Sequence, residues 1–422
     1  MKQQKVRYRT MRSIENLERM LSDQSSLCER KKWKRWQIHR SNVIERFEYS
    51  REEAIRLARG ILTSDPPFEA ELIQQLFKFK DPMERYESLD TKMEKGKIDV
   101  LIVASPILVQ EIAGIPALKQ GQQSIVIYQR DSEKIIVLEQ IKQGGDYLED
   151  LTKGLLNGTI AIEDRVEDLV KTIKPLNLGS IRYWSDELYA WQAELSSLEV
   201  PYTVLASKIT AGAIDKTLRW VNQALQEFRV ISIENMKHLL YKHYGEIVDL
   251  LSISEIFRII PFIERIEAKF SLPNRLVLSI ESGIRLVEDD EIVRTGTKVS
   301  RTLVINPEGQ DLYALLKESV SEHMAFSCFT NARGRDVYMA AIEKSTRFQP
   351  FIEQEKYDLS FLIGKDHWGN ETFSKTSTYM LDSGTSGSIE MCRCTRYGDL
   401  IYGEMFLAHP HKGLNLTKYH PF

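Results

Sequence analysis

The sequence predicts a protein of mixed α/β and α+β class, in which a basic helical extension precedes a small α/β domain and a larger C-terminal domain. The chain has 422 residues, which is too long for one ordinary hydrophobic core. Apolar strands alternate with amphipathic helices between about 97 and 210, as in a small α/β domain. Residues 1–60 hold 16 Lys/Arg and 8 Asp/Glu, a net charge of +8, whereas the whole chain carries −3. We place the domains at 1–84, 85–212 and 213–422.

The extension shows helical patterning from residue 11 to about residue 80. Within it, a short segment mixes bases with tryptophans: Lys31, Lys32, Trp33, Lys34, Arg35 and Trp36. Such a mixture can stack on nucleobases and hold phosphates. We favour a basic helix face whose tryptophans pack inward, because no fold-level signature of a nucleic-acid-binding protein accompanies it. We therefore do not expect nucleic acid as a partner, although the +8 charge could bind an acidic partner.

The α/β domain is read from its apolar runs. We predict strands at Asp99–Pro106, Ser124–Tyr128, Lys134–Ile141, Gly179–Trp184 and Tyr202–Ala206, with helices at Arg165–Ile173 and Glu187–Leu198. Strands that alternate with helices in this way favour a largely buried sheet.

Helices dominate the start of the C-terminal domain, and strands follow them. We predict helices at Leu218–Phe228, Ile233–Tyr244 and Ser254–Phe270, the last one interrupted only at Pro261. We then predict strands at Arg275–Val287 and Ser300–Ile305, helices at Asp311–Phe326 and Arg333–Ser345, and short strands and turns from Ser360 onward.

Composition limits the class of protein. No apolar run approaches the roughly 20 residues that a membrane helix needs, so we expect no membrane association. Four cysteines, Cys28, Cys328, Cys392 and Cys394, are too few and too unevenly spaced for a disulfide scaffold. We therefore expect a cytoplasmic protein with reduced thiols.

Two parts of the chain resemble the creatinase, aminopeptidase P and prolidase superfamily. The run R-Y-E-S-L-D-T-K-M-E-K-G-K-I-D-V-L-I-V-A-S-P, Arg85–Pro106, resembles the opening of that family's N-terminal domain. Further along, Leu276–Gly283, Lys298–Thr302 and Pro307–Val320 stand in the order of the first strand, the D-x-T-R-T motif and the following helix of its pita-bread domain. The resemblance covers about 85–422 and implies a pita-bread-like C-terminal domain. Because family members are usually dimers, it also implies a homodimer.

The chain departs from the resemblance at the metal ligands. The family's metal enzymes hold two divalent ions with two Asp, one His and two Glu. Here Glu281 stands at the first Asp position and Lys298 at the second, and an ammonium cannot bind a cation. His367 is the sole candidate for the histidine, and the two Glu ligands have no clean match, although Asp382 and Glu390 lie in about the right region. We therefore expect neither metal nor another cofactor.

The resemblance nevertheless implies a pocket with three candidate catalytic residues, Glu281, Lys298 and His367. By analogy with the metal-free creatinases, His367 would act as a general acid and base, with Glu281 beside it. The alternative is that His367 is a turn histidine and Glu281 a solvated carboxylate at a strand end. Arg301, Asp382 and Glu390 are the candidate substrate-binding residues.

Two functions follow from these residues. The first is a divergent, metal-free relative that acts on or binds a small amide, guanidino or peptide-like compound; if it is an enzyme, it is a metal-independent hydrolase or lyase acting on a C–N bond. The second is a non-catalytic pseudoenzyme scaffold whose basic N-terminal arm engages a partner or nucleic acid.

Overall fold

The chain forms two compact units in a computed structural model. Unit 1 is Met1–Val43 with Ser88–Ser185, and unit 2 is Ile44–Glu87 with Asp186–Phe422. The residues that the structure describes are 32–64, 70–76, 84–119, 123–141, 144–164, 166–173, 180–194, 199–270, 276–288, 291–345, 352–354, 361–362, 371–377, 379–395, 398–418 and 420.

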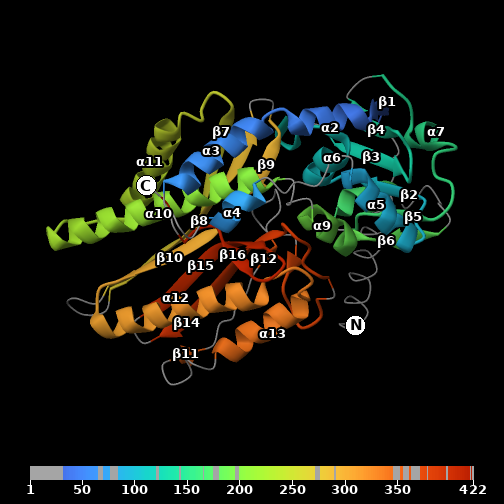
Figure 1. Cartoon of the computed structure of the whole chain (residues 1–422). Helices are drawn as coiled ribbons and strands as arrows, with labels where there is room; N and C mark the ends of the chain where they lie inside the picture. The colour runs from blue at the N-terminus through green and yellow to red at the C-terminus, as the bar shows by residue number, and fades with distance from the viewer. Residues whose placement is uncertain are drawn as a thin grey trace, which may run out of the picture. The chain divides into compact units, whose positions relative to one another are not determined.

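Unit 1 is built on a six-stranded sheet with the strand order β1-β4-β3-β2-β5-β6 (Figure 1). Its strands are β1 (Lys32–His39), β2 (Val100–Val103), β3 (Ser124–Gln129), β4 (Lys134–Ile141), β5 (Ile160–Ile162) and β6 (Ile181–Tyr183). Its helices are α5 (Glu84–Lys95, which begins in unit 2), α6 (Pro106–Ala113), α7 (Leu148–Thr152) and α8 (Glu167–Ile173), with a 3₁₀ turn at Ala117–Lys119. The parallel pairs β2–β5 and β5–β6 confirm the predicted α/β character of this part of the chain.

The basic segment is a strand, and the predicted basic helix is wrong there. β1 pairs antiparallel with β4 along its whole length, from Lys32 to His39. Trp33 is 1% exposed and packs in the core with Leu138, while Lys34 lies opposite Glu139. A free sheet edge offers this segment eight residues of backbone pairing, which outweighs its local helical pattern.

Unit 2 carries a ten-stranded sheet with the order β13-β12-β14-β15-β10-β8-β7, to which β9, β11 and β16 add. Its strands are β7 (Phe257–Phe270), β8 (Leu276–Glu288), β9 (Val293–Gly296), β10 (Val299–Val304), β11 (Ile352–Gln354), β12 (Phe361–Leu362), β13 (Glu371–Thr372), β14 (Ser386–Thr395), β15 (Gly398–Ala408) and β16 (Gly413–Asn415). Its helices are α2 (Arg40–Glu48, which begins in unit 1), α3 (Arg51–Thr63), α4 (Ala70–Gln75), α9 (Ser185–Glu194), α10 (Val200–Gln226), α11 (Ile233–Leu251), α12 (Pro307–Ser327) and α13 (Gly334–Ser345).

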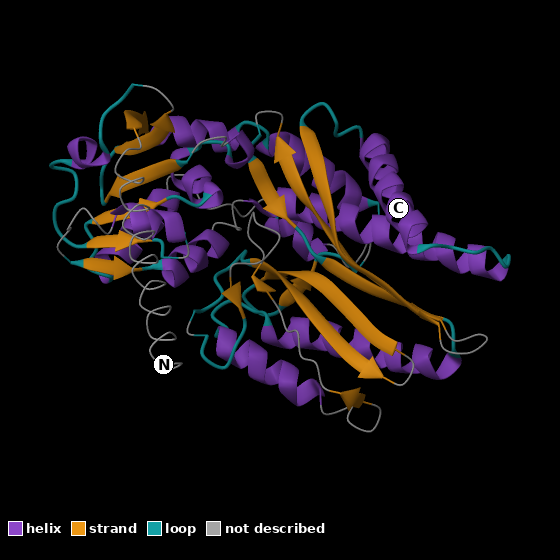
Figure 2. Cartoon of the chain, turned by 180° about the vertical axis from the view of Figure 1, so that it is seen from behind, coloured by secondary structure: helices purple, strands orange, loops and turns teal. Residues whose placement is uncertain are grey.

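Two helix pairs cover this sheet. Helices α10 and α11 pack on β8 and β7, while α12 packs on β15 and β14 and against α13 (Figures 1 and 2). Each pair closes its own hydrophobic core. No helix in the described part of the chain is both long and apolar enough to span a membrane.

Two predictions of element type are wrong in unit 2. The predicted strand Tyr202–Ala206 lies inside α10, and the predicted helix Ser254–Phe270 is mostly strand β7. Every residue of α10 from Val200 to Ile214 is buried, so its sequence lacks the periodicity that separates a buried helix from a strand. β7 is an edge strand, where Pro261 is tolerated because its missing N–H can face away from the ladder.

A buried arginine ties helix α2 to the sheet of unit 2. Arg294 on β9 is fully buried, and its Nη2 lies 2.7 Å from Glu288 Oε1. The same guanidinium donates to the carbonyl of Arg46 and lies over the rings of Phe47 and Tyr202, at 5.3 and 4.9 Å from the ring centroids. The C-terminal half of α2, which lies within the predicted extension, is therefore an integral part of unit 2.

Candidate functional site

Four adjacent strands of unit 2 bring one polar row together. Ser300 on β10 lies opposite both Glu281 on β8 and Gly403 on β15, and Gly403 lies opposite Glu390 on β14. Because directly opposed residues share a face of a sheet, the side chains of Glu281, Ser300 and Glu390 point to the same side. The Ser300 hydroxyl donates to Glu390 Oε2 across β15. Gly403 allows this contact, since a Cβ there would lie 3.2 Å from Ser300 Oγ and 3.3 Å from Glu390 Cβ.

Lys298 stands at one end of this row. Its Nζ lies 2.5 Å from Glu281 Oε1 and 3.1 Å from Glu264 Oε2. Lys298 and Glu281 are 7% and 2% exposed, whereas the side chain of Glu264 is 31% exposed and forms the solvent side of the cluster. On the other side of Glu281, Arg265 Nε lies 3.7 Å from Oε2. Glu281 is thus a buried, doubly paired carboxylate, and the alternative of a solvated strand-end group does not describe it.

Charge crowding sets the protonation of this cluster. Burial by itself would lower the pKa of the Lys298 ammonium, but the carboxylates of Glu390, Glu281 and Glu264 outweigh burial and raise that pKa above its ordinary value. Lys298 is therefore charged at neutral pH. Burial raises the pKa of Glu281, and Glu390 adds to the increase. The pKa of Glu264 is raised by burial and by Glu281. Three carboxylates thus share the charges of Lys298 and Arg265.

The residues at this site do not fit a dinuclear metal centre. Two divalent ions need several anionic ligands that offset their mutual repulsion. Here an ammonium lies between two of the available carboxylates, at 2.5 and 3.1 Å. Among the residues that the structure describes, no group of three or more His, Cys, Asp or Glu side chains is arranged to hold a metal ion. We therefore derive no chemistry through a metal.

Arg301 lies on the opposite face of the sheet from the Glu281 row. It alternates with Ser300 along β10, so its side chain points toward the helices, where its Nη2 lies 3.1 Å from Glu404 Oε2. Its Nε lies 3.5 Å from Asp215 Oδ1 on α10, and Asp215 Oδ2 lies 2.8 Å from His420 Nε2. Although burial would lower the pKa of Arg301, Glu404 and neighbouring groups raise it. This network joins the sheet, a helix and the C-terminal segment.

Asp382 is the remaining candidate substrate-binding residue, and it lies in a turn. Asp382 lies in the turn before β14, where its Oδ1 accepts a hydrogen bond from the backbone N–H of Ser383. His367 and Lys31 lie outside the described residues. The structure thus brings together Glu281, Lys298 and Glu390 of the candidates, and it separates Arg301 from them.

Two members of the site, Glu264 and Gly403, were not predicted from the sequence. Glu264 lies in the segment that was predicted to be helical, so its strand position next to Glu281 was hidden. Gly403 gives no signal by itself, because its role depends on the register of three strands. The close approach at Gly283, where a Cβ would lie 1.8 Å from the Thr297 carbonyl oxygen, is likewise visible only in the structure.

Comparison with known proteins identifies the fold. No protein-family model and no curated protein sequence matches the chain. Solved structures do match. The prolidase from Pyrococcus horikoshii aligns with a TM-score of 0.56 and 16% identity, covering 80% of this chain and 99% of that one. The Xaa-Pro dipeptidase from Bacillus anthracis aligns with a TM-score of 0.59 and 11% identity, covering 80% of this chain and 98% of that one.

A subunit of a larger complex has the same fold. The N-terminal domain of the FACT complex subunit SPT16 from chickpea, Cicer arietinum, aligns with a TM-score of 0.58 and 12% identity, covering 80% of this chain and 95% of that one. At such identities the likeness shows the fold alone. The chain has the pita-bread fold of the prolidases, which confirms the fold implied by Arg85–Pro106 and by the C-terminal motifs.

Proposed function

We propose that this chain is a metal-independent pita-bread protein that binds a small polar amide, guanidino or peptide-like compound at the Glu281–Glu390 row. The observation that carries this proposal is the position of the Lys298 ammonium, 2.5 Å from Glu281 and 3.1 Å from Glu264. A fixed cation among carboxylates supplies the positive charge that a metal would supply, without needing a full set of ligands. Solved structures with this fold include proteins named dipeptidases, which supports a peptide-like ligand.

The cluster offers complementary contacts to such a ligand. Lys298 can hold a carbonyl or carboxylate oxygen, and Glu390 can hold an ammonium or guanidinium, because one Glu390 oxygen already accepts from Ser300 while a carboxylate has further acceptor capacity. If the protein is an enzyme, Glu281, Lys298 and His367 are the proposed catalytic residues, and the reaction is cleavage of a C–N bond. Asp382 is retained as a proposed contact to the ligand.

The test is binding by the full chain, measured by calorimetry with a set of Xaa-Pro dipeptides, N-acylated amino acids and guanidino acids. Elemental analysis of the same sample should find no stoichiometric transition metal. Glu390→Gln should weaken the best compound at least tenfold, about 1.4 kcal/mol, while the exposed-helix control Glu318→Gln should not. One or more metal ions per chain, or binding that Glu390→Gln leaves unchanged, would contradict the proposal.

A second candidate function is a non-catalytic scaffold. One specific comparison favours it, because a complex subunit shares the fold. In this alternative the Lys298 cluster serves only to neutralise buried charge, and the basic N-terminal arm contacts an acidic partner. None of the small compounds would then bind. Association with the partner would weaken steeply with salt and would need residues 1–60.

We also propose a cytoplasmic location and a homodimeric state. The cysteines Cys328, Cys392 and Cys394 are free thiols, and the first two are buried, as suits a reducing compartment. Sedimentation of the purified chain tests the dimer directly, and a monomer at all accessible concentrations would exclude it.

A further inference from the structure

The corner between α10 and α11 contains an aromatic residue in a position that favours glycine. Phe228 follows the end of α10 with φ of 56°, in the left-handed region. Its N–H bonds to the carbonyl of Leu225, and the N–H of Arg229 bonds to the carbonyl of Ala224. These two bonds form a Schellman motif with Phe228 at the position after the helix cap, where glycine avoids the steric cost of a Cβ.

This strained residue gains no packing within its own chain. Phe228 is 95% exposed and its neighbour Val230 is 97% exposed. A bulky residue in the left-handed region that also exposes its ring violates two local rules at once. Violations of this kind persist where another interaction offsets them, and they point toward a functional surface.

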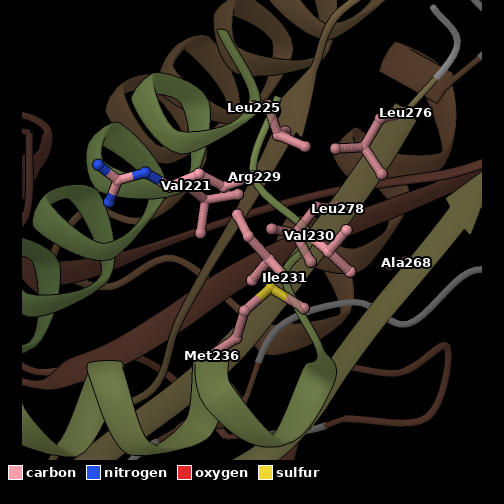
Figure 3. Close-up of a pocket in the computed structure, with 9 residues that line it drawn as sticks. All are labelled: Val221, Leu225, Arg229, Val230, Ile231, Met236, Ala268, Leu276 and Leu278. Atoms are coloured by element: carbon pink, nitrogen blue, oxygen red, sulfur yellow. The ribbon is translucent and has the colours of Figure 1, made fainter. Parts of the chain in front are cut away.

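A cavity of about 250 Å³ lies directly beside this corner (Figure 3). The side chains around it come from α10, the α10–α11 loop, α11, β7 and β8, and nearly all are aliphatic: Val221, Leu225, Arg229, Val230, Ile231, Met236, Ala268, Leu276 and Leu278. In Figure 3 the labelled aliphatic side chains converge on one space, whereas the guanidinium of Arg229 points away from it. The cavity suits an uncharged ring, since an apolar cavity of about 150 Å³ already accepts benzene.

We propose that the α10–α11 corner is an interface with a second copy of this chain, in which Phe228 of each copy occupies the apolar cavity of the other. The ring and the cavity lie within three residues of each other along the chain, from Phe228 to Ile231, so one twofold axis near the corner can satisfy both contacts. A contact of this kind is self-complementary, because the same patch serves both copies.

The charges around the corner suit contact with the same surface. Arg229 Nη2 lies 2.8 Å from Glu227 Oε2, and Lys237 Nζ lies 3.3 Å from Glu234 Oε2. Each of these two pairs joins one positive and one negative side chain. Under a twofold axis, Arg229 of one copy can meet Glu227 of the other, so charge favours a copy of this chain over a strongly acidic or basic partner.

The first test is sedimentation velocity of the full chain with Phe228→Gly. Glycine suits the left-handed position, so the folded monomer of this variant should be no less stable than that of the unmodified chain, and any loss of dimer cannot be ascribed to unfolding. The dimer Kd should rise at least about 100-fold, because two phenyl groups leave the interface. The control Phe326→Ala removes another exposed aromatic side chain, 74% exposed on α12, and should leave the Kd unchanged.

The second test locates the contact. Replacing Phe228 with the photoreactive p-benzoylphenylalanine should give a covalent dimer on irradiation, with the cross-link mapped to the peptide that contains Met236. Three outcomes would overturn the proposal: a monomer at about 100 µM, a dimer whose Kd is unaffected by Phe228→Gly, or a native mass spectrum in which the monomer carries a small apolar molecule.

Discussion

Replacing Lys298 by methionine should strongly destabilise unit 2. The substitution leaves an unbranched side chain only one heavy atom shorter and removes the ammonium that lies 2.5 Å from Glu281 and 3.1 Å from Glu264. Glu281 is 2% exposed and, among the residues that the structure describes, would keep only Arg265, at 3.7 Å, as a cationic partner. Removing one partner of a buried ion pair costs about 3–5 kcal/mol. For a unit of this size that corresponds to a fall in Tm of about 6–10 °C.

The assay is calorimetric melting of the unmodified chain and the variant between pH 5 and 8. In Lys298→Met, the folded-state pKa of Glu281 should lie above its unfolded value of about 4.3. Such a group contributes stability that is present below the unfolded pKa and lost as pH rises through the folded pKa. The Tm deficit of the variant should therefore shrink as pH falls from 8 to 5. The double variant Lys298→Met/Glu281→Gln should recover most of the loss, because it removes both charges.

The control is Lys242→Met, which removes an exposed lysine paired with Glu246 on helix α11 and should change the free energy of unfolding by less than about 0.5 kcal/mol. A Tm of Lys298→Met within 2 °C of the control, on the order of 1 kcal/mol, or a deficit that does not depend on pH, would refute the reasoning. The ammonium would then not be what balances the buried carboxylates.

Three further predictions concern other parts of the chain. Arg301→Lys should lower the free energy of unfolding of unit 2 by about 2–3 kcal/mol, because one ammonium cannot replace the separate contacts of the guanidinium with Glu404, Asp215 and the Gly403 carbonyl. Calorimetry should show this loss while ligand binding at the Glu281 row persists, since Arg301 lies on the other face. Trp33→Ala should lower the free energy of unfolding of unit 1 by about 3–5 kcal/mol, as measured by urea titration. Arg35 is exposed on the same strand, and Arg35→Ala should change that free energy by less than about 0.5 kcal/mol. Arg294→Met should cost about 3–5 kcal/mol and expose α2 to hydrogen exchange, and unchanged protection of α2 would contradict its proposed anchoring.

The two faces of the unit 2 sheet carry different polar chemistry. One face holds the Glu281 row with Lys298, and the other holds Arg301 with Glu404 under the helices. Ser300 and Arg301 are neighbours on β10 and point to opposite faces. A shift of the β10 register by one residue would therefore move each side chain to the other face of the sheet. The two pairings of β10 at Ser300, with β8 and with β15, therefore fix which charges lie on each face of the sheet.

The sequence by itself determined the fold, through its resemblance to a known family. The Arg85–Pro106 run resembles the opening of the family's N-terminal domain, and the motifs after Leu276 follow the order of its pita-bread domain. Together they predicted the pita-bread architecture, which the solved structures confirm. It also singled out Glu281, Lys298 and Glu390. Lys298 was informative because a cation at a ligand position changes the chemistry whatever the surroundings are.

The tertiary structure decided what local pattern could not. The first half of α10 is buried throughout, so its sequence is equally compatible with a strand and with a helix. Its packing on β8 determines that it is a helix. Lys32–His39 and β7, the segment that contains Pro261, are strands at the edges of their sheets. Each forms a strand because the neighbouring strand supplies its backbone hydrogen bonds. The contact of Ser300 with Glu390 across Gly403 needs three strands in register, and pairing between residues about 100 positions apart leaves no trace in the local sequence.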